Sequence, residues 1–447
     1  MYPRIVIAAT SSGTGKTTVT CGLLQALLSR GMNPCAFKCG PDYIDPMYHR
    51  KVIGIPSGNL DLFFTGEETT REIFRREFSG EIAVIEGVMG LYDGLGGTYV
   101  EASTYHLAET LQAPILLVVN ARGAGRSVLA EIKGFLDYDK DNLIQGVILN
   151  RVSPHFGETL KALIEENLHI PVLGFLPNQE VAVGSRHLGL VLPEEVPKIR
   201  EELQALAETM EQYVDIPRIC QLATKATLLP EEESAVKESF SQPKEPVRIA
   251  LAQDEAFCFY YRENLEMLER LGAQLVPFSP LRDAHLPENI QGILLGGGYP
   301  ELHLSELSGN ESLRMEIQRM ADAGIPLRAE CGGFMYLGES IQDESGQEWS
   351  MAAVHPSKSH KAVGRRRFGY ITLTSKESGR QIRAHEFHYY DSEENGDAYH
   401  AVKPVTGKSW ECIVETGNQM MGFPHLYYPS NPAFAEEFVE QCRSWKK

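Results

Sequence analysis

Residues 4–18 read RIVIAATSSGTGKTT, and this stretch decides how the first half of the chain folds. Its first part, Arg4–Ala9, has the apolar, β-branched composition of a buried strand. The segment TSSGTGKT, residues 10–17, follows the P-loop pattern with Thr10 in place of the first glycine. Thr17–Ser29 then has the apolar spacing of a helix. A strand, a glycine-rich loop and a helix in this order predict a phosphate-binding turn.

Each part of this loop has a predicted task in holding a nucleotide. Small residues let backbone N–H groups approach phosphate oxygens at the start of a helix. Lys16 is expected to contact the β- and γ-phosphates, and the Thr17 hydroxyl to join the shell of a Mg²⁺ ion. The alternative, a plain Gly/Ser-rich turn, is disfavoured by the order of strand, loop and helix. The predicted nucleotide-binding residues are Gly13, Thr14, Gly15, Lys16, Thr17 and Thr18.

A magnesium-binding acid is expected at the end of a nearby strand. The segment Ile82–Glu86 supplies one, because four apolar residues end in a carboxylate followed by Gly87. Asp93, in the sequence GLYDG, is a second candidate. The alternatives are a helix cap or surface acid for Glu86 and an Asp-Gly turn for Asp93.

Residues 38–46 read KCGPDYIDP and present two further acids, Asp42 and Asp45. Gly-Pro and Asp-Pro frame these carboxylates, which indicates a rigid loop that offers acids to a metal or a substrate. A plain turn without a ligand explains the same composition equally well.

The order of elements in the first half predicts an α/β fold. Short buried strands alternate with longer helical patterns, which is typical of a mostly parallel sheet with helices on both faces. The strands predicted most clearly are Arg4–Ala9, Ile82–Glu86, Ile115–Asn120 and Gln145–Asn150.

The α/β pattern is interrupted once and then restarts. Residues 226–246, ATLLPEEESAVKESFSQPKEP, are charged and lack apolar periodicity, so they predict a linker between domains. A second α/β series begins at Val247–Ala252, continues through a helix over 264–271 and a strand at Gly292–Leu295, and ends in β-rich segments. The predicted organisation is therefore a first domain over 1–225, the linker over 226–246, and a second domain over 247–447.

Composition limits the classes of partner. The 447 residues include 60 acidic and 42 basic side chains, for a net charge of −18. This balance argues against binding to nucleic acid or to an anionic membrane, because both need clustered Lys and Arg. The sequence shows no apolar run of the roughly 20 residues that span a bilayer. The eight cysteines are scattered without CxxC spacing, so a reduced, cytoplasmic protein is expected.

Residues 324–333, GIPLRAECGG, predict a strand that ends in a sharp turn before a helix. Cys331 on such a turn would be an exposed nucleophile, and the glycines after it leave room for a tetrahedral intermediate. The alternative is a cysteine that only fills the core. Gly297 and Gly298, in GGGYPE, could donate backbone N–H groups to an oxyanion, or belong to a flexible loop. The cysteine needs a base, and spacing alone leaves these candidates open: His355, His360, His385, His388, His400 and His425.

Taken together, these motifs make the chain similar to the cobyrinic acid a,c-diamide synthases over essentially its full length. The N-terminal half is similar to dethiobiotin-synthetase-like ATP-binding domains, and the C-terminal half to class I, Cys-dependent glutaminases. The segments that carry the resemblance are SSGTGKTT, KCGPDYIDP, VIEGVMGLYDG, GVILNRV, SRHLGL, AQDEAFCFYYRENLE, GGGYPE, AECGG, HEFHY and PHLYYPSNP. GPDYIDP and EGVMGLYDG are specific to this group among P-loop proteins.

The resemblance assigns roles in the second half. It implies Cys331 as the nucleophile and His425 as its base. The glutaminase class often has a Glu two residues after that His to orient the ring, but this chain has Tyr427 there. The resemblance therefore implies a Cys–His pair and leaves the third member unassigned.

It also assigns roles in the first half. Asp42, Asp45, Glu86 and Asp93 match the acidic positions around Mg²⁺ and substrate, so the implied metal set is Thr17, Asp45 and Glu86. The implied substrate contacts are Asp42, Tyr43, Ile44, Asp45 and Asp93. Asn150 and Pro177 match the edge that recognises adenine in the related synthetases.

The implied reaction uses ATP, Mg²⁺, glutamine and a tetrapyrrole polycarboxylate. The γ-phosphate activates a carboxylate as an acyl phosphate, and ammonia cut from glutamine replaces the phosphate. The resemblance points to the a and c acetate groups of a corrinoid; nickel-sirohydrochlorin and hydrogenobyrinic acid are alternatives. A P-loop regulatory ATPase with a degenerate C-terminal domain is a rival from another class. The sequence leaves the oligomeric state open, with a homodimer as one option.

Overall fold

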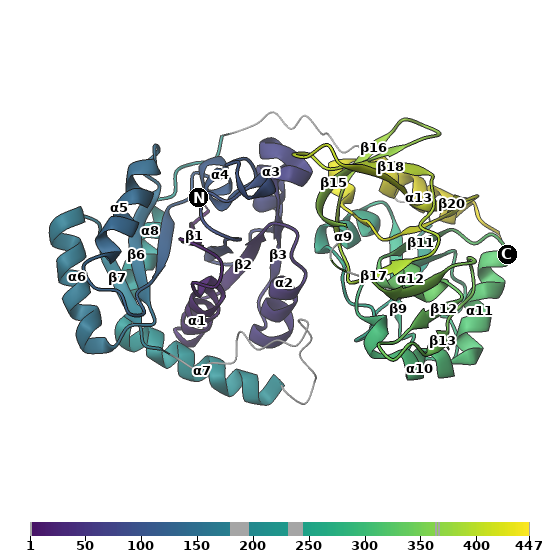
Figure 1. The fold of residues 1–447 in the computed structure, drawn as a ribbon, viewed down its shortest axis with the longest axis horizontal. Coiled ribbons are helices and arrows are strands. Elements are labelled where there is room, and N and C mark those ends of the chain that lie inside the picture. Colours follow the sequence, from purple (N-terminus) through teal and green to yellow (C-terminus); the bar gives the residue numbers. More distant parts are fainter. Residues whose placement is uncertain (1, 179–195, 231–244, 363, 365–366, 447) are drawn as a thin grey trace. The chain divides into compact units, whose positions relative to one another are not determined.

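The computed structural model describes residues 2–178, 196–230, 245–362, 364 and 367–446. The chain divides into two compact units, Met1–Ala235 and Val236–Lys447 (Figure 1). Each unit has its own sheet and its own hydrophobic core. The predicted domain limits stay a prediction, because most of the 226–246 linker lies outside the described residues. The SRHLGL motif lies outside them as well.

The first unit is built on a seven-stranded sheet with the order β3-β2-β4-β1-β5-β6-β7. Every neighbouring pair in it is parallel. The strands are β1 (Arg4–Ala9), β2 (Pro34–Cys39), β3 (Ser57–Leu60), β4 (Ile82–Glu86), β5 (Ile115–Asn120), β6 (Ile144–Asn150) and β7 (Val172–Leu176). The predicted parallel α/β fold is confirmed, and β6 begins one residue before the predicted Gln145.

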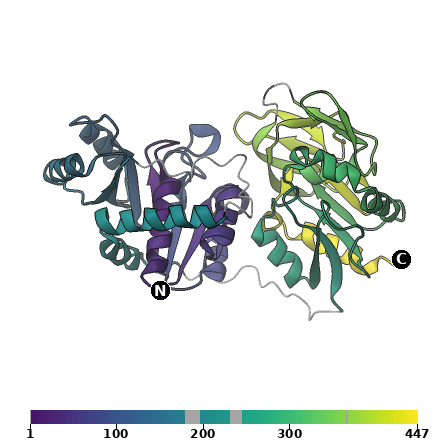
Figure 2. The same ribbon diagram turned by 90° about the horizontal axis from the view of Figure 1, so that it is seen from below.

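Helices connect these strands and cover the sheet. They are α1 (Lys16–Ser29), α2 (Ile44–Tyr48), α3 (Leu62–Glu77), α4 (Thr104–Thr110), α5 (Val128–Tyr138), α6 (Pro154–Leu168), α7 (Val196–Tyr213) and α8 (Ile216–Thr224). Two short turns of helix are η1 (His49–Ile53) and η2 (Leu95–Gly97). α7 lies across α1 in both ribbon views (Figures 1 and 2).

Burial explains why apolar residues dominate the central strands of this unit. All six residues of β1 are buried, as parallel strands covered on both faces must be. Ile5 and Ile7 join one core cluster with residues of α1, α7 and α8. The loop after β1 therefore leaves a rigid, buried strand, which fixes where the P-loop sits.

The start of α1 follows from one glycine. Gly15 has φ 109° and precedes the first helical residue, Lys16. An L side chain rarely adopts this φ, so a glycine is required where the loop turns into the helix. The helix begins one residue earlier than the predicted Thr17, because this turn is completed at Gly15.

The second unit contains a six-stranded sheet with the order β20-β21-β11-β10-β8-β9. Its strands are β8 (Val247–Ala252), β9 (Ala273–Phe278), β10 (Gly292–Leu295), β11 (Leu327–Glu330), β20 (Val414–Thr416) and β21 (Gln419–Gly422). All pairs are parallel except β20 with β21. The predicted second α/β domain is confirmed.

Two further sheets belong to the same unit. The five-stranded sheet β19-β18-β15-β16-β22 is antiparallel. Its strands are β15 (Phe368–Ser375), β16 (Gln381–Phe387), β18 (Tyr399–Val402), β19 (Ser409–Cys412) and β22 (His425–Leu426). A small sheet contains β12 (Ser340–Gln342), β13 (Glu348–Ser350), β14 (Lys358–Lys361) and β17 (Tyr390–Ser392).

The helices of the second unit are α9 (Arg262–Arg270), α10 (Leu304–Gly309), α11 (Glu311–Asp322), α12 (Gly332–Leu337) and α13 (Ala433–Ser444), with short turns at η4 (Pro300–Leu302) and η5 (Tyr428–Ser430). The helix predicted over 264–271 is α9, which begins two residues earlier. Buried residues of α9, α13 and the antiparallel sheet share one core cluster. The antiparallel sheet is therefore packed into the unit as part of its core.

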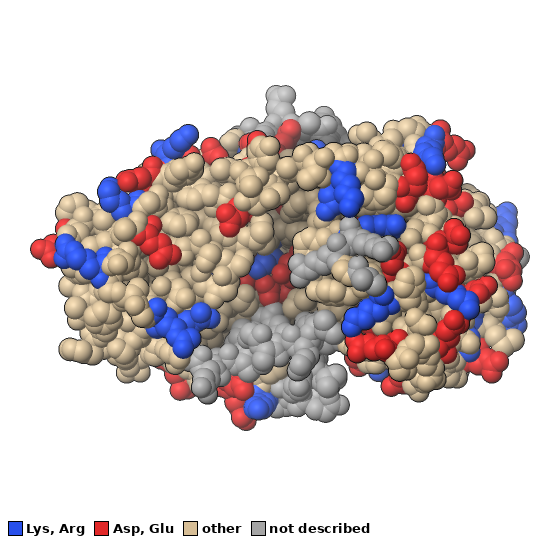
Figure 3. All heavy atoms as spheres, viewed as in Figure 1, with Lys and Arg blue, Asp and Glu red and all other residues tan. Residues whose placement is uncertain are grey.

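Charged side chains of both signs lie on the surface. On the face drawn in Figure 3, Lys and Arg side chains are interspersed with Asp and Glu. Several of them form exposed ion pairs, such as Arg380 with Glu437 at 2.6 Å and Lys358 with Glu348 at 2.9 Å. Among the described residues, no helix is both long enough and apolar enough to cross a membrane.

Gly174 in β7 offers a test of the packing in the first unit. It has φ 152°, and a Cβ there would lie 2.4 Å from the carbonyl oxygen of Tyr213. We expect Gly174→Ala to destabilise this unit by about 2–4 kcal/mol, because backbone would have to move. Gly134→Ala in exposed α5 has free space and should instead stabilise by about 0.5–1 kcal/mol. Urea unfolding of both variants checks this; equal stabilities would contradict the packing.

Candidate active sites

The P-loop presents the Lys16 side chain to the end of β1. Its Nζ atom donates to the carbonyl oxygens of Ser11, at 3.4 Å, and of Met89. Burial and the nearby charge of Lys38 lower the pKa of Lys16 to about 8. The Thr14 side chain is buried, and its hydroxyl lies 3.2 Å from that of Ser11. The loop thus holds a partly desolvated ammonium group where a phosphate is predicted to bind.

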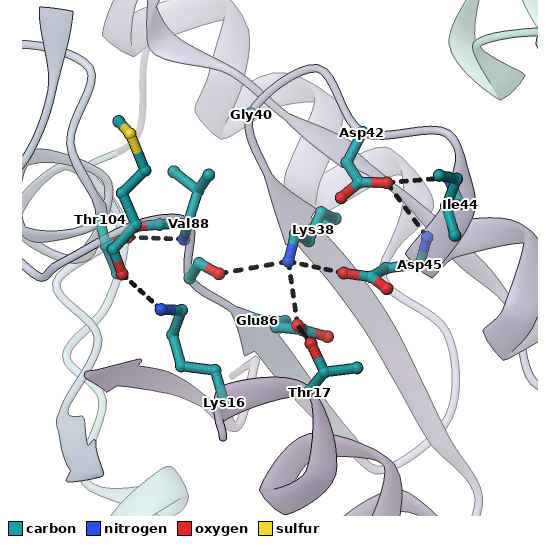
Figure 4. Close-up of polar contacts among 12 residues, drawn as sticks. Lys16, Thr17, Lys38, Gly40, Asp42, Ile44, Asp45, Glu86, Val88 and Thr104 are labelled. Atoms are coloured by element: carbon teal, nitrogen blue, oxygen red, sulfur yellow. Dashed lines mark hydrogen bonds and ion pairs between the residues drawn. The ribbon is translucent and has the colours of Figure 1, made fainter. Parts of the chain in front are cut away.

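A second lysine, Lys38, forms ion pairs with both of the acids that are predicted to bind a metal. Its Nζ atom lies 2.9 Å from Glu86 and 2.7 Å from Asp45 (Figure 4). The Thr17 hydroxyl donates to the same Glu86 oxygen at 2.6 Å. Lys38 also donates to the carbonyl oxygen of Gly87 at 3.3 Å. The structure therefore brings Thr17, Asp45 and Glu86 together and places an unpredicted lysine between the acids; the metal-binding role of the three residues stays a prediction.

Burial and crowding of like charges set the electrostatics of this cluster. Burial and the neighbouring Asp45 raise the pKa of Glu86 to about 7, against the opposing effect of Lys38. Burial and Asp45 also raise the pKa of Asp42. Burial alone disfavours a charged lysine, but Glu86 and Asp45 outweigh it and raise the pKa of Lys38 above its ordinary value. The cluster stays stable because a cation is held among carboxylates.

Register explains why Lys38 and Glu86 meet. In the parallel pair of β2 and β4 the two residues are direct partners, and each lies at or near the end of its strand. His49 adds a further contact, with Nε2 3.7 Å from Glu86 and Nδ1 3.1 Å from the Ser57 hydroxyl. Neither Lys38 nor His49 was predicted from the sequence. Lys38 could have been considered as a site residue because it is the first residue of the motif KCGPDYIDP. His49 lies outside this motif, and no sequence pattern indicates a role for it.

Side-chain hydrogen bonds hold the loop of residues 38–46, for which the sequence predicts a rigid conformation. The Asp42 carboxylate accepts the backbone N–H groups of Ile44, at 2.8 Å, and Asp45, at 3.2 Å, and so begins α2. Buried Asn59 donates to the carbonyl oxygens of Gly40 and Asp42, at 2.9 and 2.7 Å. Asn59 is a further residue that the sequence analysis missed. Tyr43 and Ile44 are half-buried at the start of this helix.

The remaining predicted residues of the first unit have local partners. Asp93 accepts the backbone N–H of Gly90 at 2.9 Å, the contact expected of a turn. Asn150 ends β6, and its side-chain amide donates to the carbonyl oxygen of Thr14 at 2.8 Å, directly over the P-loop. Pro177 follows the last residue of β7. The structure therefore brings Asn150 to the P-loop, while Asp93 belongs to the neighbouring turn.

The donor set of this cluster fits Mg²⁺. A hydroxyl and two carboxylates are hard oxygen ligands, and Mg²⁺ sites commonly combine one or two carboxylates with waters and substrate phosphates. A bound cation would also relieve the repulsion between Glu86 and Asp45. Within the described residues, the structure contains no group of three or more His, Cys, Asp or Glu that could hold a metal by itself. The nucleotide would therefore have to supply part of the shell.

Cys331 lies between β11 and α12 on a strained turn. Its φ is 49° and its ψ −105°, a conformation that a non-glycine residue rarely adopts. Its backbone N–H donates to the carbonyl oxygen of Gly422 at 2.8 Å, which ties the turn to β21. Strain of this kind persists where surrounding structure enforces it and is common at active sites. The predicted sharp turn is confirmed. The predicted exposure of Cys331 is wrong, because the residue packs into the core of its unit and is only 6% exposed.

His425 reaches this region from the antiparallel sheet. It begins the two-residue strand β22, where it pairs with His385 of β16. The side chain is 2% exposed. A Cβ on Gly297 would lie 2.4 Å from Cε1 of His425, so the loop after β10 packs directly on the imidazole ring. On the other side, the Glu330 carboxylate lies 3.7 Å from Nδ1 of His425.

The predicted oxyanion loop lies against the turn that follows Cys331. A Cβ on Gly332 would come within 3.1 Å of the backbone nitrogen of Gly298. The Gly297 carbonyl accepts backbone N–H groups from Cys258 and Phe259, both at 3.0 Å, which fixes the loop. The structure thus gathers Gly297, Gly298 and His425 around the turn that carries Cys331, although the sequence had placed them in three separate segments.

The other candidate histidines have different surroundings. His355 stacks on Phe334 with ring centroids 4.6 Å apart, and His388 stacks on Phe423 at 4.0 Å. His400 pairs with Glu411, and both side chains are exposed. His360 lies exposed in β14. Burial and the nearby His425 lower the pKa of His385 to about 3, so it stays neutral.

Burial and the neighbouring Glu301 raise the pKa of the Cys331 thiol above its ordinary value. The thiol is therefore protonated at neutral pH, and the short helix α12 is not enough to ionise it. A base must take the proton before the sulfur can attack, which agrees with a paired histidine.

Comparison with known proteins covers both units. Residues 5–190 match the model of the CobQ/CobB/MinD/ParA nucleotide binding domain, and residues 248–430 match the model of the CobB/CobQ-like glutamine amidotransferase domain. The cobyrinate a,c-diamide synthase of Caldanaerobacter subterraneus is 40% identical over 451 residues, covering 98% of this chain and 98% of the relative. The enzyme of the same name from Clostridium acetobutylicum is 40% identical over 450 residues, covering 97% and 99%.

The chain belongs to the cobyrinate a,c-diamide synthase family. The resemblance predicted from the motifs is therefore confirmed, and it extends over nearly the whole chain. In this family member the nucleotide-binding match falls on the unit with the P-loop, and the amidotransferase match falls on the unit with Cys331.

Gly297 gives a test of the glutaminase geometry in this member of the family. We expect Gly297→Ala to displace the His425 ring and to reduce glutamine hydrolysis by about a hundredfold or more, because small misplacements of a base are costly. Gly309→Ala, in α10 with no atom within 4 Å of the new methyl group, is the matched control and should retain full activity. Glutaminase assays of both variants check this, and normal hydrolysis by Gly297→Ala would contradict the placement of His425.

Proposed function

We propose that this protein uses ATP and glutamine to convert the a and c acetate carboxylates of cobyrinate into amides, as a carbon–nitrogen ligase of cobalamin biosynthesis. The observation that carries the proposal is the presence of two different sites in one chain. One holds a P-loop lysine beside a buried acidic cluster, and the other holds a strained cysteine beside a buried histidine. The names of full-length relatives support the substrate.

The first site would activate the carboxylate. Lys16 and the P-loop N–H groups would hold the β- and γ-phosphates, and Asn150 would face the adenine side. Thr17, Asp45 and Glu86 would hold Mg²⁺, which when bound neutralises charge on the phosphate oxygens. Asp42, Tyr43, Ile44 and Asp93 would contact the substrate. A carboxylate oxygen attacks the γ-phosphorus, ADP leaves, and the acyl phosphate now carries a good leaving group.

Lys38 would keep this site organised between turnovers. It offsets the charge of Glu86 and Asp45, which are both buried and would otherwise repel each other. The two acids would therefore be held in place before nucleotide and cation arrive.

The second site would supply ammonia. His425 takes the Cys331 proton, and the sulfur attacks the side-chain carbonyl carbon of glutamine. N–H groups of Gly297 and Gly298 would stabilise the oxyanion. His425 then gives its proton to the departing ammonia, and water hydrolyses the remaining thioester to glutamate. Ammonia attacks the acyl phosphate in the first site, an amide forms, and phosphate leaves.

The alternative substrates and the alternative function as a regulatory ATPase have less support. The relatives are named for cobyrinate, which does not favour nickel-sirohydrochlorin or hydrogenobyrinate. A regulatory ATPase with a degenerate second domain does not account for the packing of Gly297 on His425, since a degenerate domain has no need to keep it.

Two variants test whether carboxylate activation and glutamine hydrolysis take place at separate sites. We expect Cys331→Ser to lose glutamine-dependent amidation by about a thousandfold or more and to keep amidation with free ammonia, because only the nucleophile is missing. We expect Lys16→Ala to lose amidation with either nitrogen source and to keep its capacity to hydrolyse glutamine. Product formation is followed by mass spectrometry and glutamate release by an enzymatic assay.

Three results would contradict the proposal. Wild-type protein that never hydrolyses glutamine would remove the second site from the reaction. Loss of the ammonia-dependent reaction in Cys331→Ser would show that the sites are not separable. Amidation of a nickel or metal-free tetrapyrrole acid in preference to cobyrinate would overturn the substrate.

A further inference from the structure

The position that often orients the histidine in class I glutaminases has no acid in this chain. Tyr427 occupies it, fully buried, with its ring packed edge-on against Tyr261 at 5.1 Å between centroids. An imidazole that accepts a thiol proton becomes a cation, and a buried cation needs a partner. Another carboxylate must therefore serve His425 if the site works as a triad.

Glu330 is the carboxylate that faces His425. Its Oε2 atom lies 3.7 Å from Nδ1 of the ring, and its Oε1 atom accepts the backbone N–H of Leu426 at 3.2 Å. The first contact joins the acid to the ring, and the second joins it to the residue that follows His425. Glu330 also ends β11 immediately before Cys331, so it holds the strand of the nucleophile next to the strand of the base.

Other acids near the site have different partners. Glu386, buried in β16, lies 3.3 Å from Nε2 of His388 and accepts the Trp410 indole N–H at 3.3 Å. Glu301 follows the predicted oxyanion loop and is half-buried, and its charge contributes to the raised pKa of the Cys331 thiol. Among the described residues, the titratable groups near His425 include Glu330 from β11 and His385 from β16.

We propose that Glu330 is the positioning residue for His425, and that it completes a Cys331–His425–Glu330 triad in place of the acid missing at 427. This inference rests on the proposed glutaminase function. The carboxylate fixes the ring so that Nε2 takes the thiol proton, and it stabilises the imidazolium that results. A separation of 3.7 Å is an ion-pair distance, and catalytic hydrogen bonds are often longer in the free enzyme than in the substrate complex.

The test is Glu330→Gln, which keeps the size of the side chain and an oxygen for the Leu426 N–H. We expect kcat for glutamine hydrolysis to fall by about a hundredfold or more with little change in KM, because ring orientation is lost and binding is not. Ammonia-dependent amidation should stay at the wild-type rate. Glu330→Asp, which keeps the charge, should recover part of the loss.

The pH profile separates orientation from a structural effect. Without the carboxylate, protonated His425 is less favoured, so the acidic limb of kcat/KM for glutamine should move to lower pH. Glu377→Gln, at an exposed turn of the same unit, is the matched control and should leave rate and profile unchanged.

Two outcomes of the Glu330→Gln experiment would overturn the proposal. The first is wild-type glutamine hydrolysis with an unmoved pH profile. The second is loss of ammonia-dependent amidation together with glutaminase activity, which would mean that Glu330 only maintains the fold. Failure of the proposed function is distinguishable, because wild-type protein would then hydrolyse no glutamine.

Discussion

The ion pairs of Lys38 with Glu86 and Asp45 are the interactions on which the arrangement of the first site depends. The Lys38 ammonium group lies between the buried carboxylates of Glu86 and Asp45, and removal of one partner from such a cluster leaves an uncompensated buried charge. The parallel sheet makes the arrangement possible, because the strands that carry Lys38 and Glu86 end at the same edge as the strand before the P-loop. Ligands of open α/β sheets bind at this edge.

In the second unit, the proposed reactive residues come from different sheets. Cys331 follows a strand of the parallel sheet, whereas His425 begins a two-residue strand of the antiparallel sheet. Gly297 lets the loop after β10 approach the His425 ring, and Glu330 links the two sheets through its contacts with His425 and Leu426. Backbone strain at Cys331 is tolerated because hydrogen bonding to β21 fixes the turn.

Much of this architecture could be predicted from sequence. β1, β4, β5, β8 and β10 have the predicted limits, because short apolar runs bounded by turn residues leave little freedom. The P-loop and the turn at Cys331 were predictable from local spacing. The antiparallel sheet around His425 was not, since β22 is too short to show a period. Lys38, His49 and Asn59 were missed as partners because pairing register and long-range packing, which bring them to the first site, leave no local pattern. For the same reason the sequence could not assign Glu330 as the third member beside Cys331 and His425.

The most direct test follows nitrogen from glutamine into the product. The protein is incubated with ATP, a magnesium salt, cobyrinate, glutamine labelled with ¹⁵N in its side-chain amide, and a low concentration of unlabelled ammonium. We expect mass spectrometry to find a diamide with label in both new amides, and a slower, unlabelled diamide from Cys331→Ser. An unlabelled product from the wild-type protein, or a labelled one from Cys331→Ser, would contradict the account.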